Sequence, residues 1–326
     1  MTKFIASLAV LFCINLLMVS SIAPNLFAKQ LISWIIGLIV FQLGLHLNLK
    51  QLIPYKWTIL VLCISLLCLP LILNQFTRGS RRWINIGNIS IQPSEYVKPG
   101  LMVFLSGNQL PLFHLIPVFL IMLQPDLGSA ISVLFLISPL ILYDKKLFKL
   151  FAILSLSLLL LSPIIWKFGL KEYQRHRIIT FINPSSDPLN TGYNVIQSKI
   201  AIGSGGIFGK GYKKGTQGQL LFLPEKHTDF IFAAIAEELG IVGICILIFA
   251  YYNLITTLFK KAYSTQDRPL FIFILGISIQ LWMQIFVNVG MNIGILPVTG
   301  IPLPFISIGG SSMIAYLFAL GICFSS

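Results

Sequence analysis

Long apolar stretches recur along the whole chain, and they constrain the fold more than any other feature. They fall at residues 4–21, 31–47, 58–73, 112–123, 127–143, 150–166, 230–258, 270–289 and 304–324. A further short helix is expected to begin near Glu95. Hydrophobic residues make up 56% of the 326 residues and charged residues only 10%, against about 25% in typical soluble domains, so a soluble fold could not bury this apolar surface.

The pattern predicts an all-α, polytopic membrane helix bundle of about ten transmembrane helices. An upright spanning helix needs roughly 20 residues, and the shorter stretches fit helices that are buried inside a bundle. We expect residues 1–326 to form a single transmembrane domain, with residues 167–228 as one long extracytoplasmic loop between helices 7 and 8. The first stretch lacks a clear small-x-small cleavage site, so it is interpreted as a helix and not as a signal peptide.

Several classes of function find no support in the sequence. The five cysteines lie in apolar stretches without paired spacing, and the four histidines are scattered, so no disulfide framework and no zinc site are expected. The GxxxxGK[ST] and G-x-G-x-x-G motifs are absent, so no nucleotide cofactor is expected. The net charge of +13 could suggest nucleic acid, but in a membrane protein the positions of the basic residues matter more, and no nucleic-acid partner is expected.

An even number of spans with both termini in the cytoplasm places three basic groups on the cytoplasmic side. These groups are Lys50 with Lys56, then Lys145, Lys146 and Lys149, and finally Lys260, Lys261 and Arg268. The arrangement agrees with the positive-inside rule, whereas the opposite orientation would place all three groups outside. We therefore expect a multi-pass protein of the cytoplasmic membrane with both termini inside.

Two other basic groups then fall on the outer side. The first comprises Arg78, Arg81 and Arg82, and the second, in the long loop, comprises Lys171, Arg175, Arg177, Lys199, Lys210, Lys213, Lys214 and Lys226. Such cations suggest an anionic partner, such as a phosphate or diphosphate. The glycine-rich stretch 201–219 could also bring its backbone close to a phosphate. Anionic lipid headgroups are the alternative, and long loops translocate largely regardless of charge.

The stretch 220–240, LLFLPEKHTDFIFAAIAEELG, places an aspartate at the edge of the hydrocarbon. Its polar part carries Glu225, Lys226, His227 and Asp229 directly before an apolar helix. An ionisable group at that depth is costly, so it indicates a functional site. The alternative is that Thr228 or Asp229 merely caps the helix that follows.

Six segments resemble one family, in the expected order over nearly the whole chain. They are RRWINIGNISIQPSEYVK (81–98), LQPDLGSA (123–130), YQRHRI (173–178), DPLNTGYNVIQSKIAIGSGGIFGKG (187–211), GTQ with FLPEKHTDFIFAAIAEELGIVG (215–243) and LPVTGIPLPFISIGGSS (296–312). The chain thereby resembles the SEDS family of shape, elongation, division and sporulation proteins. Lys199, Lys210 and the LPVTG stretch make it most similar to the elongation branch.

The resemblance implies a ten-helix protein of the bacterial inner membrane that polymerises peptidoglycan glycan strands from lipid II, an undecaprenyl diphosphate-linked precursor. It implies a class B penicillin-binding protein as the partner that supplies the transpeptidase, along with other membrane proteins of the elongation complex. Two features depart from the family pattern: Ile308 replaces the usual tyrosine, and Pro99-Gly100 interrupts a helix that is usually smoother.

The resemblance also carries residue roles. Asp229 aligns with the family's essential extracellular-loop aspartate, the proposed catalytic residue. Glu95 and Lys98 match a family pair within the membrane, and a structural salt bridge at i, i+3 is the alternative. Asp126 follows Pro125 at an expected helix start, where an N-cap role competes with substrate contact.

Other residues are weaker candidates for substrate contact. They are Arg82, Lys199, Lys210 and Gln217, with Glu225 and His227 beside Asp229. Glu237 and Glu238 are expected to orient helices or to pair inside the bundle.

The chemistry itself needs few groups. Converting an α-linked sugar diphosphate into a β-1,4 glycan inverts the anomeric centre, so direct displacement needs only one base, for which Asp229 is the candidate. Asp229 could instead hold a divalent cation, Mg²⁺ or Mn²⁺, on the diphosphate, and the metal ligands are unknown from sequence. A flippase that transports lipid II and a non-catalytic scaffold that activates a partner synthase are the competing functions.

Overall fold

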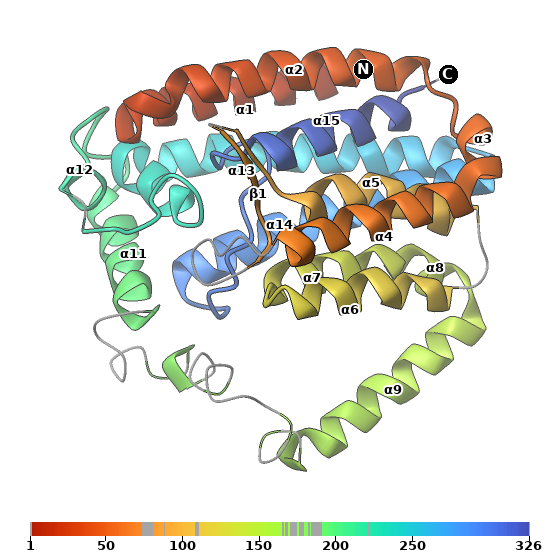
Figure 1. Ribbon diagram of the computed structural model, residues 1–326. Coiled ribbons are helices and arrows are strands. Elements are labelled where there is room, and N and C mark those ends of the chain that lie inside the picture. Colours follow the sequence, from red (N-terminus) through yellow and green to blue (C-terminus); the bar gives the residue numbers. More distant parts are fainter. Residues whose placement is uncertain are drawn as a thin grey trace.

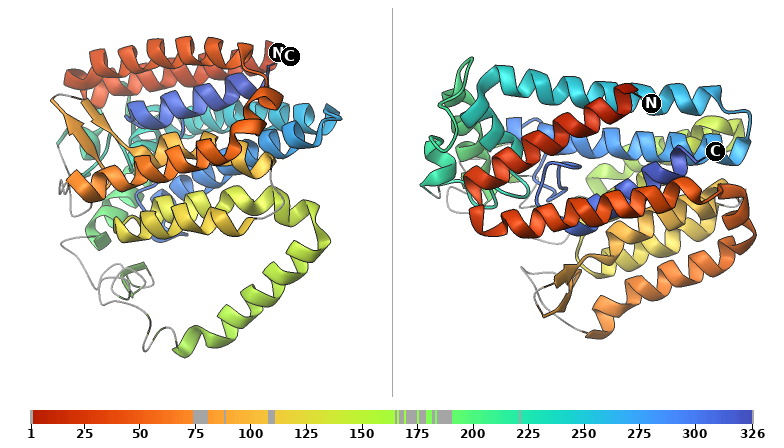
Figure 2. Two further views of the ribbon diagram at one scale, coloured as in Figure 1. Left: turned by 45° about the vertical axis from the view of Figure 1, so that its right-hand side comes forward. Right: turned by 90° about the horizontal axis from the view of Figure 1, so that it is seen from above.

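The computed structural model describes residues 2–73, 81–87, 89–107, 111–164, 191–220 and 222–325, together with residues 166, 169, 175, 179–181 and 183. Arg78, Lys171 and Arg177 of the predicted outer basic groups lie outside these described residues. Helices dominate the fold and lie roughly along one direction, with both termini at the same end of the bundle (Figures 1 and 2).

The described residues contain ten helical segments that could lie in a membrane, which confirms the predicted helix bundle. Six are long enough to cross a membrane: α1 (Thr2–Ile22), η1 with α2 (Pro24–Leu26, Phe27–His46), α3, η2 and α4 (Leu49–Leu52, Ile53–Tyr55, Lys56–Leu73), α9 (Lys145–Ile164), α13 (Ile231–Ser264) and α14 (Arg268–Ile293). Four are shorter: α5 (Pro93–Ser106), η3 with α6 (Pro111–His114, Leu115–Leu123), α7, η4 and α8 (Leu127–Leu134, Phe135–Ile137, Ser138–Tyr143), and α15 (Gly310–Cys323).

Smaller elements fill the end of the bundle opposite the termini. A hairpin of β1 (Ile84–Ile86) and β2 (Ile89–Ile91) pairs Ile84 with Ile91 before α5 begins. Helix α11 (Thr191–Gly205) and the short α12 (Thr216–Gln219) lie within the loop predicted at 167–228. Helix α9 packs on α8 and stands apart from the other helices (Figure 1).

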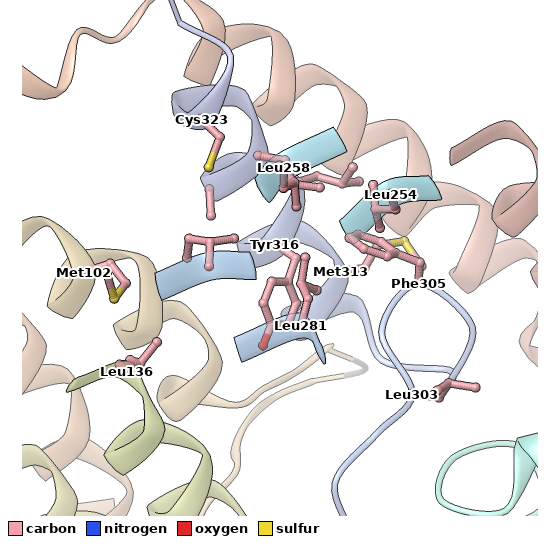
Figure 3. Close-up of a cluster of buried hydrophobic side chains, with 14 of the residues drawn as sticks. Met102, Leu136, Leu254, Leu258, Leu281, Leu303, Phe305, Met313, Tyr316 and Cys323 are labelled. Atoms are coloured by element: carbon pink, nitrogen blue, oxygen red, sulfur yellow. The ribbon is translucent and has the colours of Figure 1, made fainter. Parts of the chain in front are cut away.

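The core of the bundle gathers around α15. Its residues Met313, Tyr316 and Cys323 meet side chains of α5, α13 and α14, namely Met102, Leu254, Leu258 and Leu281 (Figure 3). Most of α15 is buried although the helix is short, because other helices surround it. This explains how a helix of 14 residues can be stable in a membrane bundle.

One expected helix proved shorter than its apolar stretch. The stretch 304–324 was expected to be helical throughout, but α15 begins only at Gly310. Phe305 has a φ of 63°, and Ser307 Oγ accepts a hydrogen bond from Leu303 N at 2.8 Å. Residues 303–309 therefore form a buried loop, because side-chain and left-handed backbone geometry replace helical hydrogen bonds there.

Glycines allow α2 and α15 to cross closely. A Cβ atom on Gly44 would lie 2.7 Å from the carbonyl oxygen of Phe318, and one on Gly321 would lie 2.9 Å from Gly44 Cα. Small residues at such crossings let two backbones approach within the membrane, where packing rather than the hydrophobic effect drives association.

Replacing Gly321 by alanine is predicted to destabilise the bundle by about 1–3 kcal/mol, because the added methyl group meets the α2 backbone, which has no flexible end to yield. Gly203→Ala is the matched control, since nothing lies within 4 Å of the Cβ position in the exposed part of α11. Thermal unfolding in one detergent would compare the two variants. Equal melting temperatures for Gly321→Ala and the wild type would contradict this account of the crossing.

Candidate active site

A tight turn presents Asp229 just before α13. The Glu225 carbonyl accepts hydrogen bonds from Thr228 N at 3.1 Å and from Phe230 N at 3.2 Å, and Glu225 Oε2 accepts one from Thr228 Oγ1 at 2.9 Å. Glu225 has a φ of 51°, so the backbone reverses there. The N-cap of α13 is Phe230, so neither Thr228 nor Asp229 occupies that position. Asp229 itself is half-buried.

The loop that precedes α15 holds this turn by hydrogen bonds to two of its main-chain carbonyls. Ile308 N donates to the His227 carbonyl at 2.9 Å, and Ser307 Oγ donates to the Thr228 carbonyl at 2.6 Å. Ile308 acts here through its backbone, so the contact does not require the tyrosine that is usual at this position. The loop 303–308 thus fixes the two residues that precede Asp229.

Two asparagines of α14 hold Asp229 directly. Asn288 Nδ2 donates to the Asp229 carbonyl at 3.1 Å, and Asn292 Nδ2 donates to the same oxygen at 3.0 Å. Sequence reasoning missed both residues. The available signal was two polar side chains four residues apart, and therefore on one face, near the end of an apolar helix.

The segment 299–301 faces the carboxylate of Asp229. A Cβ atom built on Gly300 would lie 3.5 Å from Asp229 Oδ2. Gly300 has a φ of 71°, which suits glycine. On its other side this segment meets the start of α7, because a Cβ on Gly128 would lie 2.5 Å from the Thr299 carbonyl oxygen. The Thr299 hydroxyl oxygen is buried without a hydrogen-bond partner in the structure.

The glycine-rich stretch 201–219 binds anions, but these anions belong to the protein. Glu237 and Glu238 are both buried on α13. The Glu237 carboxylate accepts hydrogen bonds from Gln217 N at 2.9 Å, Gly218 N at 3.2 Å, Thr216 Oγ1 at 2.9 Å and Lys210 Nζ at 2.7 Å. The Glu238 carboxylate accepts from Ser21 Oγ, Gln219 Nε2 and Lys213 N.

Lys210 and Gln217, which were predicted to contact substrate, both bind the Glu237 carboxylate in the structure. Lys210 forms an ion pair with Glu237, and the Gln217 backbone binds the same carboxylate. The physical reason is that a buried carboxylate needs a cation and donors, and this loop supplies them. Gln217 Oε1 is buried and has no hydrogen-bond partner among the described residues. The expectation that Glu237 and Glu238 pair inside the protein is confirmed.

Backbone pairing joins the same loop to a break in α13. Gly240 has φ 67° and ψ −164°, which is not helical. The Gly206 and Ile207 carbonyls accept from Ile241 N at 3.0 Å and Val242 N at 3.1 Å. In return, Lys210 N and Gly211 N donate to the carbonyls of residues 237 and 238. The backbone N–H and C=O groups that lose their helical hydrogen bonds at the break thus bond with residues of the loop, because a membrane offers them no water.

Lys226 links the turn to this network. Its side chain is buried and Nζ donates to the Gly218 carbonyl. Burial lowers the pKa of Lys226 below its ordinary value, whereas the negative charge of Glu238 raises it. Lys226 is therefore a structural cation, held between the turn that carries Asp229 and the loop around Glu237.

Arg82 and Asp126 form a second cluster behind the hairpin. Arg82 Nη1 lies 3.1 Å from Asp126 Oδ1, which also accepts from Ser129 N at 3.1 Å. The Asp126 side chain thus caps α7, as one of the two sequence interpretations predicted. Arg82 Nε has no hydrogen-bond partner in the described structure, and the side chain is 24% exposed.

Glu95 and Lys98 form a buried ion pair of 2.6 Å on α5, which agrees with the salt bridge expected from their spacing. Glu95 Oε2 is buried without a partner, and Lys98 Nζ lies 5.6 Å from the centre of the Tyr316 ring. Helix α5 runs on through Pro99, and Gly100 lets it approach Cys63 of α4.

Lys199 lies elsewhere, at the C-terminal end of α14. A Cβ on Gly294, the left-handed C-cap of α14, would meet the Lys199 ammonium group. A cation near the last carbonyls of a helix is stabilised by the helix dipole. The described contacts therefore assign Lys199 a helix-end position and do not bring it to Asp229.

The described residues contain no group of three or more His, Cys, Asp or Glu side chains that could hold a metal ion. Asp229, Glu225 and His227 share one turn, whereas Arg82 and Asp126 pair between the start of the hairpin and the start of α7, and Glu95 and Lys98 pair on α5. The arrangement offers the Asp229 carboxylate on a backbone held by α14, with buried donors and cations nearby.

Replacing Lys210 by methionine is predicted to cost about 1–3 kcal/mol of stability, because Glu237 would stay buried without its cation. The double variant Lys210→Met with Glu237→Gln should recover at least half of the lost melting temperature, since the unpaired charge is then removed. Thermal unfolding measures both variants. Wild-type stability of Lys210→Met would contradict a structural role and favour substrate contact.

Comparisons with known proteins agree along the whole chain. The family model for FtsW, RodA and SpoVE, described as cell cycle protein, matches residues 1–325. The peptidoglycan glycosyltransferase MrdB of Escherichia coli K12 is 41% identical over 290 residues, covering 83% of this chain and 76% of MrdB. The probable peptidoglycan glycosyltransferase FtsW of Geobacter metallireducens is 34% identical over 319 residues, covering 90% of this chain and 82% of FtsW.

Solved structures show the same fold. One chain of a peptidoglycan synthase complex, described as coordinating polymerization and crosslinking, aligns with a TM-score of 0.85 at 33% identity, covering 99% of this chain and 96% of that chain. The rod shape determining protein RodA of Thermus thermophilus aligns with a TM-score of 0.71 at 27% identity, covering 98% and 94%. With a family match over residues 1–325, this multi-pass membrane protein belongs to the SEDS family of FtsW, RodA and SpoVE.

Proposed function

We propose that the chain is a peptidoglycan glycosyltransferase that polymerises lipid II into β-1,4 glycan strands, at the outer face of the bacterial inner membrane, during cell elongation. Relatives that are 41% and 34% identical carry the names peptidoglycan glycosyltransferase and probable peptidoglycan glycosyltransferase. The structural observation that carries the proposal is Asp229, a carboxylate at the end of the bundle whose main chain is bonded by α14.

Asp229 acts as the general base in this proposal. The 4-hydroxyl of the acceptor sugar attacks the anomeric carbon of the donor, and Asp229 takes the hydroxyl proton as the new bond forms. The bond to the undecaprenyl diphosphate breaks on the opposite face, so the α-linked donor gives a β-linked product. A second carboxylate is not needed, since diphosphate is a good leaving group.

The charge of the leaving diphosphate calls for cations. Arg82 is supported as one of them, because its Nε lacks a partner among the described residues and a quarter of its side chain is exposed. A guanidinium suits bidentate contact with phosphate oxygens. Lys210 is less supported, since its ammonium group already pairs with Glu237.

The proposed orientation places both termini in the cytoplasm. Both ends of the chain lie at one end of the bundle, as does α3, whereas α11 and α12 lie at the other end (Figure 1). Asp229 follows α12 in the sequence and comes just before α13. The basic residues of the α3 region and of the α8–α9 turn favour the cytoplasm for the terminal end. Asp229 then faces the side on which a lipid-linked precursor is polymerised.

A class B penicillin-binding protein is the proposed partner, alongside other elongation-complex membrane proteins. Its support is that one structural neighbour comes from a complex described as coordinating polymerization and crosslinking. Such a partner supplies the transpeptidase, which this chain is not proposed to perform.

A divalent cation, Mg²⁺ or Mn²⁺, is proposed to assist by neutralising the diphosphate. The described residues do not form a complete ligand set, so the ion would be held mainly by substrate oxygens. Binding of the ion by Asp229 is the alternative to its role as general base. The proton transfer to Asp229 does not depend on this metal ion.

Removing divalent ions with EDTA is predicted to slow polymerisation at least about tenfold, because Coulomb stabilisation of the leaving group is lost. Full activity in EDTA would overturn the metal proposal and leave the base proposal standing.

Asp229→Asn is predicted to reduce polymerisation by about 10²–10⁴-fold, because an amide cannot accept the proton. Purified complex with labelled lipid II measures the rate, and the melting temperature should stay unchanged. Asp144→Asn is the matched control, an exposed carboxylate between α8 and α9 that accepts from Lys146 N.

Equal polymer from wild type and Asp229→Asn would remove Asp229 from the chemistry. That result would direct attention to the partner and to the flippase and scaffold hypotheses. Loss of polymer in Asp144→Asn as well would show that the assay reports folding or assembly and not the chemistry of residue 229.

A further inference from the structure

Asn288 and Asn292 make an unusual pair on α14. Both side chains are completely buried near the end of α14, whose other buried polar side chains are Ser278, Gln280 and Gln284. A buried amide that loses its hydrogen bonds costs free energy, so such a residue in an apolar helix needs partners. Both amides have partners on the segments around Asp229, and Asn292 also contacts Asn288 of its own helix and Ser198 of α11.

Asn288 joins two segments that are distant in sequence. Its Nδ2 donates to the Asp229 carbonyl at 3.1 Å and to the Ile301 carbonyl at 2.8 Å. Ile301 follows Gly300, on which an added Cβ atom would lie 3.5 Å from Asp229 Oδ2. One planar amide thus sets the spacing between the turn that carries Asp229 and the segment 299–301.

Asn292 fixes the direction of the same turn. Its Nδ2 donates to the Asp229 carbonyl at 3.0 Å, and its Oδ1 accepts from Ala233 N at 3.2 Å in the first turn of α13. The main-chain carbonyl of Asn292 accepts from Ser198 Oγ of α11 at 2.7 Å. Asn292 therefore contacts both Asp229, which precedes α13, and Ala233 in the first turn of α13.

We infer that Asn288 and Asn292 are positioning residues that hold the Asp229 carboxylate at a fixed distance from the segment 299–301, so that a sugar hydroxyl is accepted between them in reactive geometry. Both amides donate to the main-chain carbonyl of Asp229, and an amide does not titrate, so neither residue serves as a proton acceptor. This inference rests on the proposed glycosyltransferase function and names the acceptor hydroxyl as the group that the two asparagines serve.

Positioning has a kinetic signature. Misplacement of a catalytic group by about 1 Å can cost on the order of 100-fold in rate while the substrate still binds. Asn288→Ala should therefore lower kcat about 10- to 100-fold and leave KM for lipid II within about twofold. Asn288→Gln keeps the amide donor, so the fold should be retained, but the extra methylene displaces Asp229 and kcat should still fall at least about fivefold.

The experiment measures kcat, KM and melting temperature for the complex of full-length chain and transpeptidase. Gln124→Ala is the matched control, because Gln124 is also buried and its Nε2 donates to the main-chain carbonyl of Leu67 at 2.7 Å. Gln124→Ala thus loses a hydrogen bond from a buried side-chain amide to a main-chain carbonyl, and this bond does not involve Asp229. Its melting temperature should fall as in Asn288→Ala, whereas its kcat per folded molecule should stay within about twofold of wild type.

The outcomes separate the two hypotheses. If wild type polymerises lipid II and Asn288→Gln has wild-type kcat, or if Asn288→Ala matches Gln124→Ala per folded molecule, the positioning role is overturned and the proposed function stands. A raised KM with unchanged kcat also overturns it, because it indicates substrate contact. If wild type forms no polymer, the proposed function fails and this inference fails with it.

Discussion

Backbone that leaves a helix inside a membrane must find its hydrogen bonds within the protein, and this constraint organises the whole Asp229 end of the bundle. It is met twice. The break of α13 at Gly240 is paired with residues 206–211, and the turn 225–230 is paired with the loop 303–308. Because both pairings involve α13 or the residues just before it, the helix break, the glycine-rich loop and the turn that carries Asp229 form one connected unit.

Buried charge follows from that arrangement. Glu237 and Glu238 lie about one turn before the break, and the glycine-rich loop supplies them with Lys210 and several backbone N–H groups. Lys226, which follows that loop, is a further cation under the influence of Glu238. A stretch that looks like a phosphate cradle in the sequence thus binds carboxylates of its own chain. The candidate site contains the half-buried Asp229, which shares its turn with Glu225, on a backbone held by uncharged side chains of α14. A rigid backbone is what a general base needs, because proton transfer requires close and directed contact.

Local patterns predicted the features that depend on local physics. Apolar stretches predicted the helices, the i, i+3 spacing predicted the Glu95–Lys98 ion pair, and the position of Asp126 after Pro125 predicted its cap on α7. Features that depend on distant partners were missed or misjudged. The apolar residues 304–309 form a loop because Phe305 has a positive φ and Ser307 accepts a hydrogen bond from Leu303 N, and hydropathy encodes neither feature. Lys210 pairs with Glu237, a residue that only the folded chain brings close to it. Asn288 and Asn292 carried a visible signal, but their partner Asp229 could be identified only in three dimensions.

The most direct measurement is a density map of the Asp229→Asn complex with lipid-linked donor and glycan acceptor bound. The account predicts the acceptor 4-hydroxyl within about 3 Å of the side chain of residue 229, between that residue and Gly300, with the diphosphate on the opposite side of the donor sugar. An acceptor hydroxyl out of reach of residue 229 and beside a different carboxylate, such as Glu225, would contradict the central claim.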